Sequence, residues 1–153
     1  MPYKTILLAY DGTAEGRRAL LEGAELAKRC QADTHLLAVI ADSTGGAIAQ
    51  GVGAEPMQRT VYFRATLEDG VKFCKSLGLE AKSHVVHGEP VEEIVKLANE
   101  IKADLVVVGH RDRGPLARWW STPTSMSLLD KLSCSLLIGM REAGERLRRD
   151  GKT

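Results

Sequence analysis

A loop that follows an apolar strand carries groups suited to binding an anion. The run Leu105–Val108 has the composition of a buried strand, and it ends at Gly109. Arg111 lies two residues further on, and Thr122–Pro123 has the composition of a helix start. Glycine lets backbone amides approach a phosphate, while a guanidinium group and a helix N-terminus attract it. This order of residues favours an anion site at the carboxyl end of a parallel strand.

Two further side chains are candidates for contact with a ligand. Asp11 directly follows the first apolar run, where it can contact a ribose or a metal or can serve as a turn residue before Gly12. His110 follows Gly109, where it can contact a ligand or can hydrogen bond within its own loop. The sequence leaves both alternatives open for each residue.

The elements that must position these groups alternate between strands and helices. Apolar runs separated by segments of helical period predict an α/β fold, with a parallel sheet covered by helices on both faces. A glycine-rich segment, Asp42–Pro56, predicts a long loop. Arg59–Leu77 is helical by pattern, and Val61, Ala65, Glu68 and Lys72 mix core and solvent faces. The predicted strands are Thr5–Tyr10, Thr34–Ile40, Ala81–Val86, Asp104–Val108 and Ser135–Met140, and the other predicted helices are Thr13–Cys30 and one that begins at Pro90.

Composition limits the classes of function. The chain has 153 residues, 44% of them hydrophobic and 27% charged, which suits one globular domain. A formal net charge of +1 argues against a general nucleic-acid binder, and no apolar run is long enough to span a membrane. With no signal peptide before the first strand, we expect a cytoplasmic protein. We expect one domain over residues 1–140 and a polar tail over residues 141–153.

Cysteine and histidine spacing predicts neither a disulfide framework nor a metal site. Cys30, Cys74 and Cys134 are odd in number and widely spaced, which favours buried or half-buried thiols. His84 and His87 lie three apart on a predicted strand, so their side chains face opposite ways. We therefore expect no metal ligands.

Three segments resemble the universal stress protein family: ILLAYDGTAEGRRAL, HGEPVEEIVKLANEIKADLVVVGHRDRG and KLSCSLLIGM. The resemblance covers roughly Lys4–Met140 in the correct order. It implies an open sheet of five parallel strands in the order 3-2-1-4-5, of the Rossmann-like, adenine-nucleotide alpha-hydrolase-like type. It also implies a homodimer paired through the fifth strand.

Many members of that family bind ATP through the pattern Gly-x2-Gly-x9-Gly-Ser/Thr. On this chain the four positions fall on Gly109, Asp112, Thr122 and Pro123, so only the first is kept. The family's adenine and ribose positions fall on Ala9, Asp11 and Val39, which are compatible with those contacts.

The replacements predict weak or absent ATP binding. Asp112 places bulk and a negative charge beside a phosphate, and Pro123 has no amide hydrogen to donate. Arg111, Arg113 and Arg118 partly offset this loss. The loop also resembles the subgroup named for universal stress protein A, whose members generally lack the nucleotide motif.

These features favour a non-enzymatic stress-response homodimer with weak or no ATP binding and with no catalytic residues. The alternative is an ATP-binding member that acts as a nucleotide-dependent switch. An enzyme is disfavoured because the sequence has no GxxxxGK[ST] loop and no nucleophile elbow. Of the adjacent Trp119 and Trp120, we expect one to pack on the core, while the other can pack over the helix start or dock a protein partner. We expect neither nucleic acid nor membrane as a partner.

Overall fold

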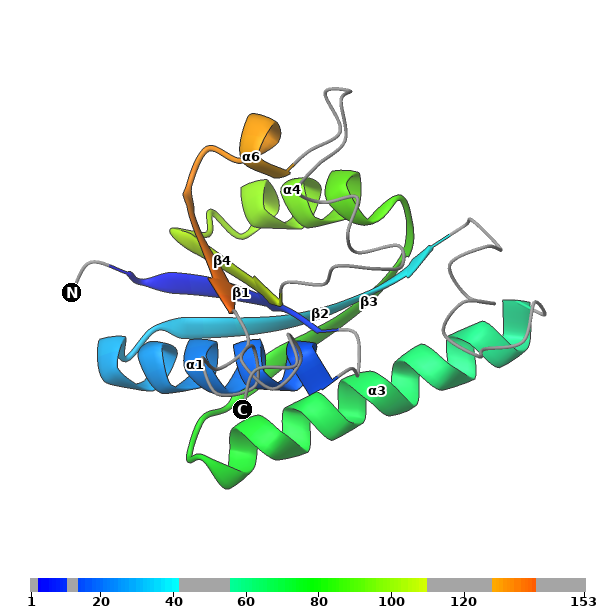
Figure 1. The fold of residues 1–153 in the computed structure, drawn as a ribbon, viewed down its shortest axis with the longest axis horizontal. Helices are drawn as coiled ribbons and strands as arrows, with labels where there is room; N and C mark the ends of the chain where they lie inside the picture. The colour runs from blue at the N-terminus through cyan, green and yellow to red at the C-terminus, as the bar shows by residue number, and fades with distance from the viewer. Residues whose placement is uncertain (1–2, 11–13, 42–55, 110–127, 140–153) are drawn as a thin grey trace, which may run out of the picture.

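Five parallel strands form one sheet in the order β3-β2-β1-β4-β5, as the sequence predicts (Figure 1). The computed structural model describes residues 3–10, 14–41, 56–109 and 128–139. The predicted strand ends lie within two residues of the observed ones. In chain order, the elements are β1 (Thr5–Ala9), α1 (Ala14–Cys30), β2 (Asp33–Ala41), α3 (Pro56–Ser76), β3 (Ala81–Gly88), α4 (Pro90–Glu100), β4 (Leu105–Gly109), α6 (Leu128–Lys131) and β5 (Ser135–Gly139).

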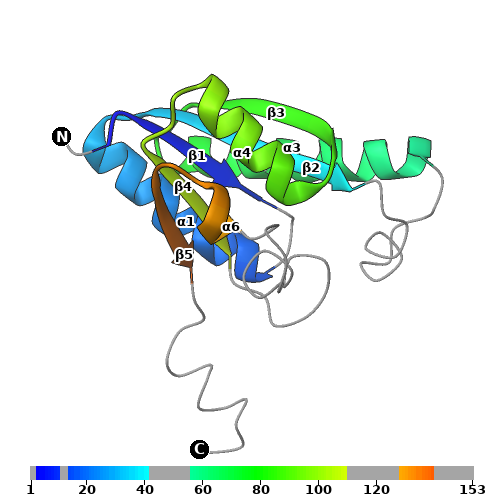
Figure 2. The same cartoon turned by 90° about the horizontal axis from the view of Figure 1, so that it is seen from above.

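Helices cover both faces of the sheet, which divides the core into two layers. Figure 1 shows α1 and α3 on one face and α4 with α6 on the other, and Figure 2 shows the same arrangement from above. Strand β4 is buried along its whole length, and residues 6–9 of β1 are buried as well. Alternate side chains of β1 enter opposite layers: Ile6 and Leu8 face α1 and α3, whereas Leu7 faces α4.

Local sequence explains where α3 and α4 begin and end. Pro90 occupies the first turn of α4, and the Glu89 side chain accepts a hydrogen bond from the Glu92 amide at 3.0 Å. Gly78 follows α3 with φ +81, a left-handed conformation that glycine adopts without strain. Pro56, which the sequence placed in a loop, is instead the first residue of α3, where its missing amide hydrogen costs nothing.

The predicted faces of α3 need a correction. The sequence expectation was that Val61, Ala65, Glu68 and Lys72 mix core and solvent faces, but all four are exposed. The helix instead buries a face that includes Phe63, Thr66, Leu67 and Cys74. The expected stripe mixed charged and apolar residues, so its periodicity could not show which side meets the sheet.

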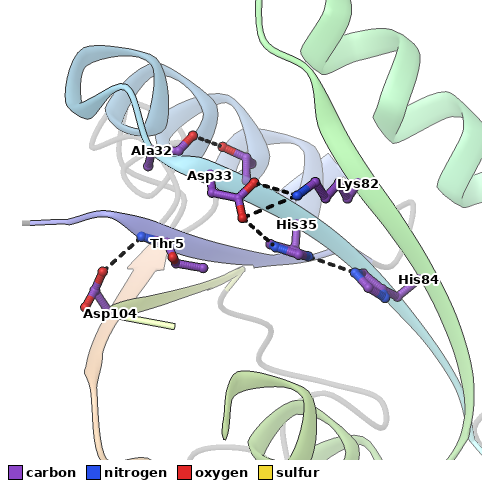
Figure 3. A network of polar contacts seen from close by, with 8 residues as sticks. Thr5, Ala32, Asp33, His35, Lys82, His84 and Asp104 are labelled. Carbon is purple, nitrogen blue, oxygen red and sulfur yellow. Dashed lines mark hydrogen bonds and ion pairs between the residues drawn. The ribbon is translucent and has the colours of Figure 1, made fainter. Parts of the chain in front are cut away.

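Asp104 joins the amino ends of the central strands. Its carboxylate accepts hydrogen bonds from the amide of Thr5 at 2.9 Å (Figure 3) and from the amide of Lys4 at 2.7 Å. Its own amide donates to the Thr5 carbonyl at 2.8 Å. These backbone hydrogen bonds lower the pKa of the Asp104 carboxyl. The start of β4 is therefore fixed against the start of β1.

Gly139 lets the end of β5 touch α1. A Cβ at this position would lie 2.5 Å from the Cβ of Ala19 and 2.6 Å from its Cα. Because one of those atoms belongs to the helix backbone, only a shift of α1 or β5 could relieve the overlap. Register pairs Gly139 with Gly109, so this close approach sits beside the end of β4.

We predict that Gly139→Ala lowers the free energy of unfolding by about 1–3 kcal/mol, the usual cost of overpacking. Urea denaturation would measure the change. The matched control is Ser135→Ala, at the exposed start of the same strand, which should stay within about 0.5 kcal/mol of wild type. Equal midpoints for Gly139→Ala and wild type would show that α1 does not contact β5 so closely.

Candidate functional site

The carboxyl ends of β1 and β4 form the topological switch point of the sheet. From β1 the chain builds β2 and β3 on one side, then crosses to β4 and β5 on the other. Ligands of open α/β sheets bind outside the strand ends at such a point, because the loops from the two halves diverge there. The loops that leave β1 and β4 both start at this place.

Three residues of the predicted site lie on the described strands near this edge. Ala9 ends β1 and is 9% exposed, and Gly109 ends β4 and is buried. Val39 lies on the neighbouring β2, where it is half-buried and packs with Ala9 against the α4 layer. The fold therefore brings Ala9, Val39 and Gly109 to one edge from three adjacent strands.

The remaining predicted groups lie outside the described residues. One is Asp11, for which the sequence left open a contact with ribose or metal and a role as a turn residue, and the others are nine residues that follow β4. Their roles stay predictions from the sequence. The predicted residues that follow β4 are His110, Arg111, Asp112, Arg113, Arg118, Trp119, Trp120, Thr122 and Pro123.

A polar cluster that the sequence did not reveal lies just beyond Ala9. Tyr10 is 5% exposed, and its hydroxyl donates a hydrogen bond to Asp69 of α3 at 3.1 Å. Arg17 of α1 forms an ion pair with the same carboxylate, and its guanidinium lies 4.9 Å from the centre of the Phe73 ring. One carboxylate thus connects the end of β1 to both helices of this face.

The charges of this cluster stabilise one another. The hydrogen bond from Arg17 lowers the pKa of the Asp69 carboxyl, and burial opposes that shift. Burial raises the pKa of the Tyr10 hydroxyl, an effect that the Asp69 carboxylate adds to and the Arg17 hydrogen bond opposes. At neutral pH the cluster therefore holds an ionised Asp69 and a neutral Tyr10 that donates to it.

The cluster of Tyr10, Arg17 and Asp69 fixes the position of the chain directly after β1, next to the predicted site. The Tyr10 amide donates to the Leu37 carbonyl of β2 at 3.0 Å, so its backbone and its side chain are both held. No motif could have indicated this arrangement, because the three polar residues come from three elements and Asp69 lies 59 positions after Tyr10. A hydrogen bond of this kind is visible only after the helices have packed.

We predict that Tyr10→Phe lowers the free energy of unfolding by about 1 kcal/mol, because it removes one part-buried hydrogen bond to a charged partner. Urea denaturation at neutral pH would measure the change. Tyr62→Phe is the matched control, since Tyr62 is a half-buried residue of α3 whose ring packs edge-on against Phe63. Equal losses in the two variants would contradict a specific role for the Tyr10 hydroxyl.

The thiols lie where the sequence expected them. Cys30 and Cys74 are buried and Cys134 is half-buried, and all three are free. Burial raises the pKa of the Cys74 thiol to about 11, so it carries almost no reactive thiolate at neutral pH. Among the described residues, no group of three histidine, cysteine or acidic side chains could hold a metal ion. None of the described helices is both long and apolar enough to cross a bilayer.

Known proteins share this fold and much of this sequence pattern. A Staphylococcus aureus (strain USA300) protein whose name assigns it to the universal stress proteins is 29% identical over 139 residues, 89% of this chain and 83% of the relative. An Archaeoglobus fulgidus universal stress protein in complex with dAMP has a TM-score of 0.66 at 24% identity, covering 90% of this chain and 98% of that one. A universal stress protein in complex with cAMP has a TM-score of 0.66 at 22% identity, covering 90% and 97%.

The solved structures are too distant in sequence to show more than the fold, which they share with this chain as a Rossmann-like α/β sheet. The family itself follows from the sequence match. The model described as the Universal stress protein family matches residues 2–138, almost the full length of the chain. With the strand order and the switch point in place, the chain belongs to the universal stress protein family.

Proposed function

We propose that this chain is a non-enzymatic, cytoplasmic stress-response protein whose adenine-nucleotide site has kept its adenosine contacts and lost its phosphate contacts. The observation that carries the proposal is the position of Ala9, Val39 and Gly109, which reach one edge of the sheet at its switch point. The complexes of two structural neighbours with dAMP and cAMP support an adenine nucleotide as the ligand class.

The phosphate half of this site is the part that has changed. Gly109 is kept, but Asp112, Thr122 and Pro123 replace the two glycines and the hydroxyl residue of the family pattern. At about 4 Å in a partly screened site, the Asp112 carboxylate would repel a phosphate by up to several kcal/mol. Pro123 removes one amide donor from the helix start. ATP is therefore held weakly or not at all.

The alternative is a nucleotide-dependent switch that keeps useful ATP affinity. The observation in its favour is the set of three arginines in the loop after Gly109, Arg111, Arg113 and Arg118. Guanidinium groups bind phosphate oxygens with two parallel hydrogen bonds, which could replace lost backbone amides. The weak-binding protein and the nucleotide-dependent switch differ in how the affinity for an adenine nucleotide depends on its number of phosphates.

We predict that isothermal titration of the wild-type protein shows AMP binding at least as well as ATP, with and without magnesium. The double variant Asp112→Gly/Pro123→Ser should gain at least about tenfold in ATP affinity, because it removes a like charge and restores an amide donor. AMP should gain less, since it carries fewer phosphate groups.

Glu22→Gln is the matched control, since it also removes one negative charge but from an exposed position on α1. It should leave both affinities unchanged. Micromolar ATP affinity in the wild type would favour the switch and would show that the arginines compensate. A double variant that still ignores ATP would mean that the proposed loss of the phosphate site is wrong.

The proposal includes a homodimer formed through β5. In the described part of the chain, β5 pairs with β4 and with no other strand, so one edge of β5 has unpaired backbone groups. Leu136, Leu137 and Ile138 are only half-buried. An apolar edge strand with open backbone groups is a template for pairing with another strand, and a second copy of β5 would cover it.

We predict a mass twice the chain mass of 16.6 kDa in light scattering after size exclusion. Leu136→Lys should shift the protein toward the monomer, because a charge on the edge strand disfavours strand pairing. Val61→Lys is the control, since Val61 is 61% exposed on α3, a helix that packs on β2 and β3 at the other end of the sheet from β5. A wild-type monomer at all concentrations would rule out this interface.

A further inference from the structure

Two histidines on adjacent strands meet at the amino half of the sheet, away from the predicted nucleotide site. Nδ1 of His35 on β2 lies 2.9 Å from Nε2 of His84 on β3, and the two ring planes are inclined by 24° (Figure 3). His35 is 7% exposed and His84 is half-buried. The sequence did not indicate this contact, because the residues are 49 positions apart and register places them diagonally across the strands.

The charged groups around the pair come from three elements. On β2, the Asp33 carboxylate lies 3.2 Å from Nε2 of His35. On β3, Lys82 lies 3.2 Å from the other oxygen of that carboxylate. On α4, which packs on this face, Glu100 is close enough to act electrostatically on His84. Strand β1 contributes the apolar Leu7, the register partner of His35.

Hydrogen bonding fixes which protonation states the pair accepts. When both rings are neutral, His35 donates from Nε2 to Asp33 and accepts at Nδ1 from Nε2–H of His84. When one proton is added, His35 donates from both nitrogens, and His84 accepts at Nε2 while carrying its hydrogen on Nδ1. Each of these states satisfies every contact in the pair.

Addition of a second proton breaks the hydrogen bond between the two rings. With both rings charged, Nδ1–H of His35 and Nε2–H of His84 point at each other, and neither ring has an acceptor to offer. Two positive charges then lie in contact, one of them on a buried ring. Asp33 can balance one of these charges, but it already bonds Lys82 as well.

We propose that the His35–His84 contact is a pH-sensitive link between β2 and the edge strand β3. The two rings stay in contact when the pair is neutral or carries one added proton, and they separate when the pair takes up a second proton. Strand β3 pairs with β2 and with no other strand of the described sheet. Under mildly acidic conditions the backbone hydrogen bonds in the amino half of β3 therefore open more often, while those of the central strands do not change.

The environment of His84 favours this behaviour. Burial is the main cause that lowers the pKa of His84, the charge of His35 lowers it further, and Glu100 opposes the shift. In the unfolded chain the same imidazole takes up its proton at a higher pH, near its ordinary value. The stability associated with His84 is therefore complete above that value and is lost as the pH falls through the lowered pKa.

The experiment is a titration of ring carbon-bound protons by NMR from about pH 8 to about pH 5, the range in which imidazole changes charge. We expect the pKa of His84 to lie below the ordinary value of an imidazole, because burial and the neighbouring His35 lower it. In His35→Phe, which keeps a ring but removes its nitrogens, the pKa of His84 should rise toward the ordinary value of an imidazole. His87→Phe is the matched control and should leave His84 unchanged.

Amide hydrogen exchange is measured on the wild-type protein, so its result does not depend on whether a variant folds. Protection factors over residues 81–85 of β3 should fall at least about tenfold across the acidic half of the titration, while those of β4 stay constant. The proposal is overturned if His84 titrates at the ordinary imidazole value, or if the protection of β3 follows that of β4 throughout. It is also overturned if His35→Phe does not move the pKa of His84.

Discussion

Burial of the central strand pair on both faces is the constraint on which the structure depends. Strands β1 and β4 are almost purely apolar, and each places alternate side chains into two separate core layers. Such strands are stable only when helices cover both faces, and parallel strands require crossover connections that supply those helices. Helix α1 packs against one face of this pair, and buried side chains of α4 and α6 join the core layer on the other face (Figure 1).

The same constraint creates the candidate site. The sheet grows outward on both sides of β1 and β4, so their carboxyl ends form the topological switch point at which open α/β sheets bind ligands. The adenosine contacts and the phosphate contacts of the proposed site then come from different strands. Either half can change by substitution while the sheet beneath it stays the same.

Polar groups hold the two edges of the sheet in different ways. At the carboxyl edge, Asp69 joins Tyr10 to Arg17 and connects β1 with α1 and α3. At the amino edge, Asp104 fixes the start of β4 to the start of β1 through backbone amides. The histidine pair instead joins β2 to an edge strand that has one neighbour in the described sheet, where local opening costs the least core packing.

Hydrophobic pattern alone determined the fold class and the approximate bounds of the strands. The family resemblance supplied the strand order, and it also assigned the adenine and ribose positions to Ala9, Asp11 and Val39. The fold class and the strand bounds follow from local periodicity and from the rules of parallel sheets, because each strand and helix carries its own hydrophobic period.

Only the tertiary structure decided which face of α3 is buried and which distant polar groups meet. The contacts of Tyr10 with Asp69 and of His35 with His84 join residues from separate elements, 59 and 49 positions apart. Neither local propensity nor spacing encodes such pairs. They depend on strand register and helix packing, which form only when the whole core has been assembled.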